Sequence, residues 1–235
     1  MLYVNEIFGP TIQGEGKSAG RPVAFLRLAG CNLQCSWCDT PHTWNWIGTS
    51  FKNPAKFAKN DEVHKMTIDD VYAAVVATGM KALVISGGEP LLQQNNLKDL
   101  VWKLSTEGWW IELETNGTIA PTIFMAEFLD QINCSPKLAS SQLPKQQRIN
   151  VKALLTLTSC AKTNFKFVVD SDDDLQEMLC LVRNFGMKEV RVMPQCQTKD
   201  ELQAKEPRLQ AIASAHGFIY CTRLSILKSG TERRV

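Results

Sequence analysis

The chain has 235 residues, of which 44% are hydrophobic and 21% are charged, and its formal net charge is +2. This length fits one large domain, and the nearly balanced charge gives no electrostatic reason to expect a nucleic-acid partner. The sequence contains no run of eighteen apolar residues and no basic-then-apolar segment at its N-terminus. We therefore expect a single domain, residues 1–235, that is soluble and cytoplasmic and does not associate with a membrane.

Short apolar runs alternate with amphipathic stretches along the chain. The runs typical of buried strands are residues 23–28, 82–86, 110–114, 131–134, 165–169, 189–193 and 218–221. The stretches with helical periodicity are residues 68–78, 96–106, 123–128, 172–185 and 200–215. Such alternation favours a parallel sheet with right-handed crossovers. Because roughly six strand–helix units are too few for a closed eightfold barrel, we predict an open, partial parallel β/α barrel.

Residues 43–66 interrupt this alternation. Trp44, Trp46 and Pro54 lie there together with Lys52, Lys56 and Lys59. This composition predicts an insertion that carries one short helix or forms a flap.

Three of the eight cysteines, Cys31, Cys35 and Cys38, lie within eight residues. Thiolates are soft ligands and suit iron–sulfur clusters, zinc or copper. A closed zinc site and an ordinary four-iron cluster both need four protein ligands, whereas this run stops at three. The pattern therefore predicts a four-iron cluster with one iron open to another ligand. A structural zinc site completed by His42 is the alternative.

The other five cysteines are scattered through the chain. They are Cys134, Cys160, Cys180, Cys196 and Cys221. Most lie in apolar segments, where a free cysteine behaves as a small hydrophobic side chain. Since no export signal precedes them, we expect reduced thiols that do not bind the cluster.

Polar and glycine-containing segments follow the predicted strands at their carboxyl ends. The cysteine loop follows the first strand, and residues 86–90 and 114–117 end the next two. Residues 135–137 and 194–195 end later strands. In parallel β/α barrels the chemistry is located at this end, so we expect these segments to form one site.

The cysteine loop and the segment Gly87-Gly88-Glu89 together resemble the radical S-adenosylmethionine superfamily, whose motifs are C-x-x-x-C-x-x-C and a G-G-E-type strand end. The resemblance implies that the three cysteines hold a [4Fe–4S] cluster whose open iron binds S-adenosylmethionine. It also implies that the G-G-E backbone receives the amino group of that cofactor. Reductive cleavage of the bound cofactor then supplies a 5′-deoxyadenosyl radical.

A narrower resemblance covers nearly the whole chain. The segments 12–16 (I-Q-G-E-G), 38–40 (C-D-T), 114–117 (E-T-N-G) and 135–137 (S-P-K) are similar to those of the 7-carboxy-7-deazaguanine synthase family of queuosine and deazapurine biosynthesis. This resemblance implies a radical lyase that converts 6-carboxy-5,6,7,8-tetrahydropterin to 7-carboxy-7-deazaguanine with loss of ammonia. It also implies a magnesium ion as a further cofactor.

The same resemblance implies three groups of site residues. Those expected to bind substrate are Ile12, Gln13, Gly14, Glu15, Arg27 and Ser86. Those expected to bind S-adenosylmethionine are Trp37, Cys38, Asp39, Gly88, Glu89, Ser135, Pro136, Lys137 and Gln195. The metal ligands expected are Cys31, Cys35 and Cys38 for the cluster and Thr40 for Mg²⁺. The guanidinium of Arg27 suits a substrate carboxylate, and the hydroxyl of Thr40 is a hard ligand of the kind that Mg²⁺ prefers.

A homodimer and an external reductant such as flavodoxin or ferredoxin are also implied. Two alternatives remain at this stage. A glycyl-radical enzyme activase shares the cysteine spacing but acts on a protein, and a zinc-stabilised binding module has no catalytic activity. Residues 13–16 and 39–40 suit a small pterin with a metal ion, and they therefore favour the synthase interpretation.

Overall fold

A computed structural model describes residues 1–47, 56–230 and 232–234. Its strands are β1 (Leu2–Ile12), β2 (Pro22–Leu28), β3 (His64–Met66), β4 (Ala82–Gly87), β5 (Trp110–Thr115), β6 (Gln131–Cys134), β7 (Thr163–Val169), β8 (Val190–Pro194) and β9 (Ile219–Tyr220). They form one sheet in the order β3-β1-β2-β4-β5-β6-β7-β8-β9. Neighbours from β2 to β9 are parallel, whereas β1 pairs antiparallel with β2 and β3. The sheet does not close on itself, so the predicted open barrel is confirmed.

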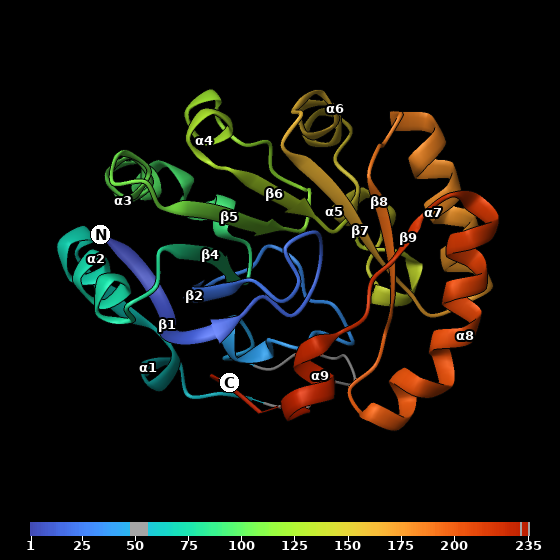
Figure 1. The fold of residues 1–235 in the computed structure, drawn as a ribbon, viewed down its shortest axis with the longest axis horizontal. Coiled ribbons are helices and arrows are strands. Elements are labelled where there is room, and N and C mark those ends of the chain that lie inside the picture. Colours follow the sequence, from blue (N-terminus) through green and yellow to red (C-terminus); the bar gives the residue numbers. More distant parts are fainter. Residues whose placement is uncertain (48–55, 231, 235) are drawn as a thin grey trace.

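The helices lie mainly on the outer side of this curved sheet. They are α1 (Lys59–Glu62), α2 (Ile68–Ala77), α3 (Gln94–Thr106), α4 (Ile123–Phe128), α5 (Lys145–Arg148), α6 (Val151–Ser159), α7 (Asp172–Phe185), α8 (Lys199–His216) and α9 (Leu224–Ser229). Figure 1 shows α2, α3, α4, α6, α7 and α8 around the outside and α9 at the open side, close to the C-terminal end. In the part of the chain that the structure describes, no helix has both the length and the apolar character needed to cross a bilayer.

Local sequence sets the helix boundaries. At the start of α2, the Thr67 hydroxyl accepts a hydrogen bond from the Asp70 amide at 3.1 Å, and the Asp70 carboxylate accepts one from the Thr67 amide at 3.3 Å. This reciprocal pair is a capping box. At the start of α7, Ser171 accepts from the Asp174 amide at 3.1 Å. That helix ends at Gly186, whose φ of 61° is left-handed and therefore suits glycine.

Alternation along the central strands separates an apolar face from a polar one. On β5, Ile111 and Leu113 are fully buried against the helices, while Glu112 and Glu114 alternate with them and belong to the inner side of the barrel. On β7, Lys166 follows the same rule and bonds Glu114 across the interior. Successive side chains of a strand point to opposite faces, so one strand supplies both the hydrophobic core and the lining of the barrel.

Every predicted strand and helix is present, with boundaries that shift by up to two residues. The sequence did not predict β1, because its register with β2 breaks between Val4 and Glu6 and again between Phe8 and Thr11. These irregularities remove the strict alternation by which a strand is recognised. Helix α6 was also missed. In the segment predicted as an insertion, α1 and β3 are described, and residues 48–55 lie outside the described residues. The insertion itself stays a prediction.

Candidate active site

A cavity of about 690 Å³ opens inside the barrel at the carboxyl ends of the strands. Sixteen of the predicted site residues line it: Ile12, Gln13, Gly14, Glu15, Arg27, Cys31, Cys35, Trp37, Cys38, Asp39, Thr40, Ser86, Gly88, Ser135, Lys137 and Gln195. They come from the ends of five strands, β1, β2, β4, β6 and β8, and from the cysteine loop. Two other predicted residues, Glu89 and Pro136, do not line it.

The cysteine loop presents its three thiols to this cavity. Cys31, Cys35 and Cys38 pack together with Leu33 and Leu143. Burial raises the pKa of the Cys31 thiol to about 12 and that of Cys35 to about 11. The thiolate forms therefore need a positive partner such as iron. Three soft sulfur ligands on one short loop fit a cluster that has no fourth protein ligand.

The zinc alternative requires a fourth ligand that meets the same ion. Among the described residues, no three or more His, Cys, Asp or Glu side chains form a group that could hold one metal ion. His42 is 4% exposed, and burial, followed by the charges of Arg233 and Arg27, lowers its pKa to about 4. A neutral imidazole can bind zinc, and the three cysteines of the cluster are likewise not preassembled around one point, so the choice between the two metal sites rests on the family of the chain.

The two glycines that end β4 allow a close approach of backbone to backbone. A Cβ at Gly87, where φ is +135°, would lie 2.1 Å from the carbonyl oxygen of Leu28. A Cβ at Gly88 would lie 2.0 Å from the carbonyl oxygen of Gly30 and 2.8 Å from Cβ of Cys31. The Gly88 amide donates to the Leu28 carbonyl at 3.1 Å. These glycines therefore seat the end of β4 directly against the start of the cysteine loop.

The side chains of Glu89 and Pro136 do not line the cavity. The Glu89 side chain is 1% exposed, and its carboxylate accepts hydrogen bonds from the Thr115 hydroxyl at 2.9 Å and the Asn116 amide at 2.7 Å. Asn116 in turn donates to the side-chain oxygen of Asn32 at 3.0 Å. Pro136 is also buried. Neither side chain lines the cavity, and a role of either residue in binding the cofactor stays a prediction.

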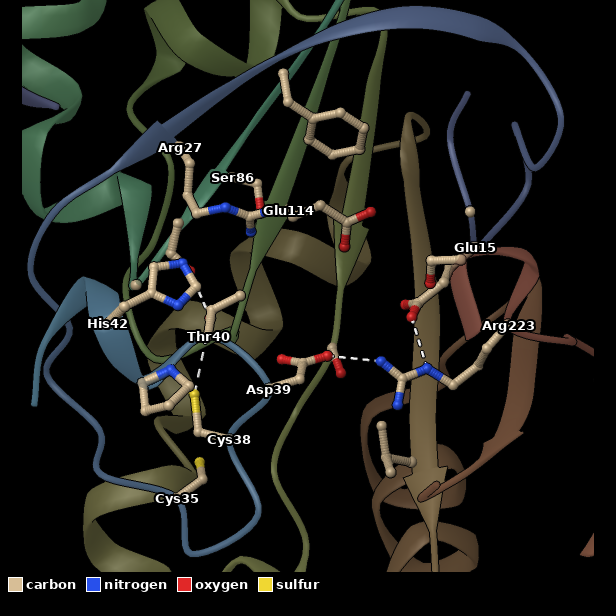
Figure 2. A pocket seen from close by; sticks show the side chains of 18 of the residues that line it. Glu15, Arg27, Cys35, Cys38, Asp39, Thr40, His42, Ser86, Glu114 and Arg223 are labelled. Carbon is tan, nitrogen blue, oxygen red and sulfur yellow. Dashed lines mark hydrogen bonds and ion pairs between the residues drawn. The ribbon is translucent and has the colours of Figure 1, made fainter. Parts of the chain in front are cut away.

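Thr40 lies where the cysteine loop meets the end of β4. Its hydroxyl donates to the Gly87 carbonyl at 3.4 Å and lies 3.7 Å from the sulfur of Cys38. Figure 2 shows the side chain directed into the cavity, beside His42 and below Arg27 and Ser86. An oxygen at this point can serve as a ligand to a hard cation.

One end of the cavity holds a chain of ion pairs. The Glu15 carboxylate lies 2.8 Å from Lys166 and 2.9 Å from Arg223. Lys166 also contacts Glu114 at 3.0 Å, and Arg223 contacts Asp39 at 2.6 Å. Burial raises the pKa of Glu15, but the charges and hydrogen bonds of Lys166 and Arg223 outweigh burial and hold that pKa at about 2. Glu15 is therefore ionised and fixed in place.

The Gln13 side chain is committed to this network. Its amide nitrogen donates to Glu112 and, at 3.2 Å, to Glu114. Asn133 bridges the same two carboxylates at 2.6 and 2.9 Å, and Ser18 donates to Glu112. Burial, together with the charge of Glu114, raises the pKa of Glu112. The amide of Gln13 thus joins two carboxylates at the wall of the cavity, and its binding of substrate stays a prediction.

Arg27 lies at the opposite end of the cavity. Its side chain is 16% exposed, and its Nε lies 2.7 Å from Glu6. The C-terminal Arg233 and Arg234 reach the same carboxylate at 3.2 and 3.0 Å, and Arg233 also binds Glu62 at 2.9 Å. Arg27 therefore points into the cavity and not out to solvent. In Figure 2, Arg27 and His42 face Glu15 and Arg223 across the cavity, with Asp39 between them.

Several lining residues were not predicted from the sequence. They are Glu6, Trp44, Lys166, Arg223, Arg233 and Arg234. Lys166 left a signal, because it is a charged residue between Phe165 and Phe167 in a mostly apolar strand. The three arginines left none, since nothing in the order of residues shows that the segment after β9 returns to the start of the chain.

Similarity to known proteins agrees with this geometry. The family described as "4Fe-4S single cluster domain" matches residues 12–149. The 7-carboxy-7-deazaguanine synthase of Rhodopirellula baltica is 32% identical over 99% of this chain and 88% of its own length. That of Pyrobaculum aerophilum is 33% identical over 99% of this chain and 96% of its own length.

Solved structures share the fold. The crystal structure of QueE from Escherichia coli superposes with a TM-score of 0.71, at 25% identity, over 94% of this chain and 93% of that chain. Streptococcus suis SuiB bound to S-adenosylmethionine superposes with a TM-score of 0.54 at 14% identity, over 82% of this chain and 48% of that one; this second likeness concerns the fold alone. From the near-complete match to the synthases, the chain belongs to the 7-carboxy-7-deazaguanine synthase family.

Proposed function

We propose that the single cavity described above holds every component of the family reaction. As a family member, the chain is a radical S-adenosylmethionine enzyme that makes 7-carboxy-7-deazaguanine from 6-carboxy-5,6,7,8-tetrahydropterin with loss of ammonia. One observation carries the residue assignment: the three cysteines of the loop, the backbone of Gly88 and the guanidinium of Arg27 all line the same cavity. A cluster, a cofactor and a carboxylated substrate can therefore lie in contact there.

The cluster and S-adenosylmethionine occupy the part of the cavity next to the cysteine loop. The cluster ligands are Cys31, Cys35 and Cys38, and the cofactor lies against Trp37, Asp39, Gly88, Ser135, Lys137 and Gln195. When bound, this pair supplies a 5′-deoxyadenosyl radical. Because the radical comes from this pair, no side chain of the chain acts as the radical initiator. The residues of the cavity hold the cofactor in position and exclude water.

The charges around Arg27 favour the carboxylate of the substrate. Three guanidiniums, of Arg27, Arg233 and Arg234, share two carboxylates, of Glu6 and Glu62. This group has an excess of positive charge and several directed N–H donors. A planar guanidinium holds a carboxylate in a two-point contact, so the 6-carboxylate of the pterin lies at this end.

The charges around Glu15 favour the opposite edge of the substrate. Three carboxylates, of Glu15, Glu114 and Asp39, share two cations, Lys166 and Arg223. The resulting negative excess attracts the amino and ring N–H donors of the pyrimidine half of a pterin. The two ends of the cavity thus select one orientation of the substrate (Figure 2).

A magnesium ion at Thr40 completes the proposal. The Thr40 hydroxyl lies beside the Gly87 carbonyl, between the cysteine loop and Arg27. Mg²⁺ binds through few protein oxygens and keeps the remaining positions for substrate oxygens and water. A homodimer in the cytoplasm and an external one-electron donor of the flavodoxin or ferredoxin type are also part of this proposal.

Anaerobic turnover tests the assignment. Protein reconstituted with iron and sulfide is incubated with the pterin, S-adenosylmethionine and a reductant, and 7-carboxy-7-deazaguanine is measured. We expect product from the wild type and from Cys180→Ala, whose cysteine is exposed on α7, and none from Cys31→Ala. Product formation by Cys31→Ala would contradict the cluster assignment. Cofactor cleavage that never yields product from the pterin would instead favour the activase alternative.

A further inference from the structure

The indole of Trp44 contacts a sulfur of the cysteine loop. Its Nε1 lies 3.3 Å from Sγ of Cys38, with the N–H as donor. The Trp44 side chain is 8% exposed and lines the cavity. A buried indole N–H usually finds an acceptor, and here the acceptor is a sulfur that the proposed function assigns to the cluster.

A single tight turn brings Trp44 back over Cys38. The 3-10 helix η1 (Pro41–Thr43) follows the cysteine loop, and the Trp44 amide donates to the Pro41 carbonyl at 3.1 Å. The Gly30 amide donates to the Thr43 carbonyl at 2.7 Å, which ties this turn to the start of the cysteine loop. The indole therefore sits on the same rigid unit as the sulfur it contacts.

The other tryptophans differ from Trp44, and one of them, Trp102, is half exposed on α3. The indole N–H groups of Trp37, Trp109 and Trp110 are buried and have no hydrogen-bond partner in the described part of the chain. Trp46, two residues beyond Trp44, donates to the carbonyl oxygen of His42 at 3.0 Å. The contact of Trp44 with sulfur is thus a specific feature of this position.

We propose that Trp44 donates a hydrogen bond to Cys38 when that sulfur is a cluster ligand, and that this bond raises the reduction potential of the cluster. Reduction adds one electron from an external donor and converts [4Fe–4S]²⁺ to [4Fe–4S]⁺. The added negative charge is shared with the sulfurs, so a fixed N–H donor stabilises the reduced form more than the oxidised one. The inference rests on the assignment of Cys38 in the proposed function.

The consequence concerns the electron donor. A cluster of higher potential is reduced to a greater extent at equilibrium by the same donor. Trp44 therefore makes the cluster easier to reduce without contacting any iron. It is a positioning and tuning residue, distinct from the three ligands.

Trp44→Phe removes the N–H donor and keeps an aromatic ring in the same place. Trp46→Phe is the matched control, because it removes an N–H that bonds a carbonyl oxygen. The midpoint potential of the reconstituted cluster is measured by dye-mediated titration with dithionite, and the reduced cluster is followed by electron paramagnetic resonance without cofactor or pterin. We expect a more negative potential for Trp44→Phe than for the wild type, and a wild-type potential for Trp46→Phe.

A second measurement guards against a Trp44→Phe protein that takes up less iron. Electron-nuclear double resonance of the reduced cluster in H₂O and D₂O detects exchangeable protons near the cluster. The Leu33 amide and the Thr40 hydroxyl also lie near sulfurs of the loop and should give couplings in all three proteins. We expect a further coupling in the wild type and in Trp46→Phe that is missing from the clusters that Trp44→Phe retains. Equal potentials and equal couplings in the three proteins would overturn the inference alone. A wild-type protein that binds no cluster would overturn the proposed function as well.

Discussion

The carboxylate of Glu15 and the guanidinium of Arg223 lie 2.9 Å apart, although 208 residues separate them in the chain. Glu15 follows β1, near one edge of the sheet, and Arg223 follows β9 at the other edge. Beside this ion pair, the Leu224 amide donates to the Gly14 carbonyl at 2.9 Å. The segment after β9 therefore spans the open side of the barrel and completes the wall of the cavity.

We expect Glu15→Gln to destabilise the protein at pH 7. The carboxylate has a pKa of about 2 in the folded protein against an ordinary value of 4.5, and this difference corresponds to roughly 3 kcal/mol of stability. Because the folded pKa is the lower one, the contribution is complete above about pH 4.5 and is lost as the pH falls toward 2. Urea denaturation at pH 7 and at pH 4 measures the effect and its decrease.

Glu189→Gln is the control for this loss. Glu189 pairs with Lys17 at 3.4 Å and, at the longer distance of 3.6 Å, with Arg191. Its own side chain is half exposed in both pairs, and exposed pairs contribute little. We expect Glu189→Gln to change the free energy of unfolding by less than about 1 kcal/mol. A Glu15→Gln protein that is as stable as Glu189→Gln at pH 7 would show that the pair with Arg223 does not hold the barrel together.

Arg27→Ala should weaken binding of the pterin and leave binding of S-adenosylmethionine unchanged. Removing a buried hydrogen-bonded charge partner costs about 2–5 kcal/mol, and each 1.4 kcal/mol is about tenfold in affinity. The dissociation constant of the pterin should therefore rise by one to several powers of ten, as calorimetry on the reconstituted protein can measure. Arg208→Ala, which removes an exposed partner of Asp172, should bind both ligands normally. Unchanged pterin affinity in Arg27→Ala would place the carboxylate elsewhere.

Thr40→Ala and Thr40→Ser separate a metal ligand from a packing residue. If the Thr40 hydroxyl binds Mg²⁺, Thr40→Ser should keep most of the turnover because the oxygen remains, whereas Thr40→Ala should lose it strongly. Iron content should be the same in both variants, because the hydroxyl approaches Cys38 no closer than 3.7 Å. Turnover is measured with and without added magnesium after chelation. Equal losses in both variants, or turnover that ignores chelation, would indicate a packing role.

The iron content of cysteine variants should divide the eight cysteines into two groups. Replacing Cys31, Cys35 or Cys38 with alanine should abolish cluster uptake. Cys196→Ala is the strictest control, because Cys196 also lines the cavity but lies beyond β8; Cys160→Ala should likewise retain iron. A need for Cys196 in cluster assembly would mean a fourth protein ligand and no open iron.

Local motifs explain why much of the site could be predicted from the sequence. The cysteine loop and the end of β4 are short segments whose geometry is set mainly by neighbours in the chain. Gly88 has no side chain, and the end of β4 can therefore lie directly against Gly30. The strand–helix alternation is local in the same way, and it predicted the open barrel correctly. The carboxyl ends of parallel strands meet at one edge, so the convergence of these segments followed from topology.

Contacts between distant segments explain what was missed. The pairing of Glu6 with Arg233 and of Glu15 with Arg223 depends on where the chain returns after β9, which no periodicity encodes. Strand β1 was missed because its irregular register hides the alternation of a strand. The orientation of the Glu89 side chain was not predictable for the same reason, because its carboxylate bonds the amide of Asn116, 27 residues further along the chain.

The central claim is that the cofactor and the pterin react in one cavity, with Arg27 holding the pterin. Its most direct test measures 5′-deoxyadenosine and 7-carboxy-7-deazaguanine together in anaerobic reactions of the wild type and Arg27→Ala. A poorly held substrate allows the radical to be quenched elsewhere, since small displacements cost rate steeply. We predict product from the wild type and more 5′-deoxyadenosine per product in Arg27→Ala. The same ratio in both proteins, or cofactor cleavage without product in the wild type, would contradict this claim.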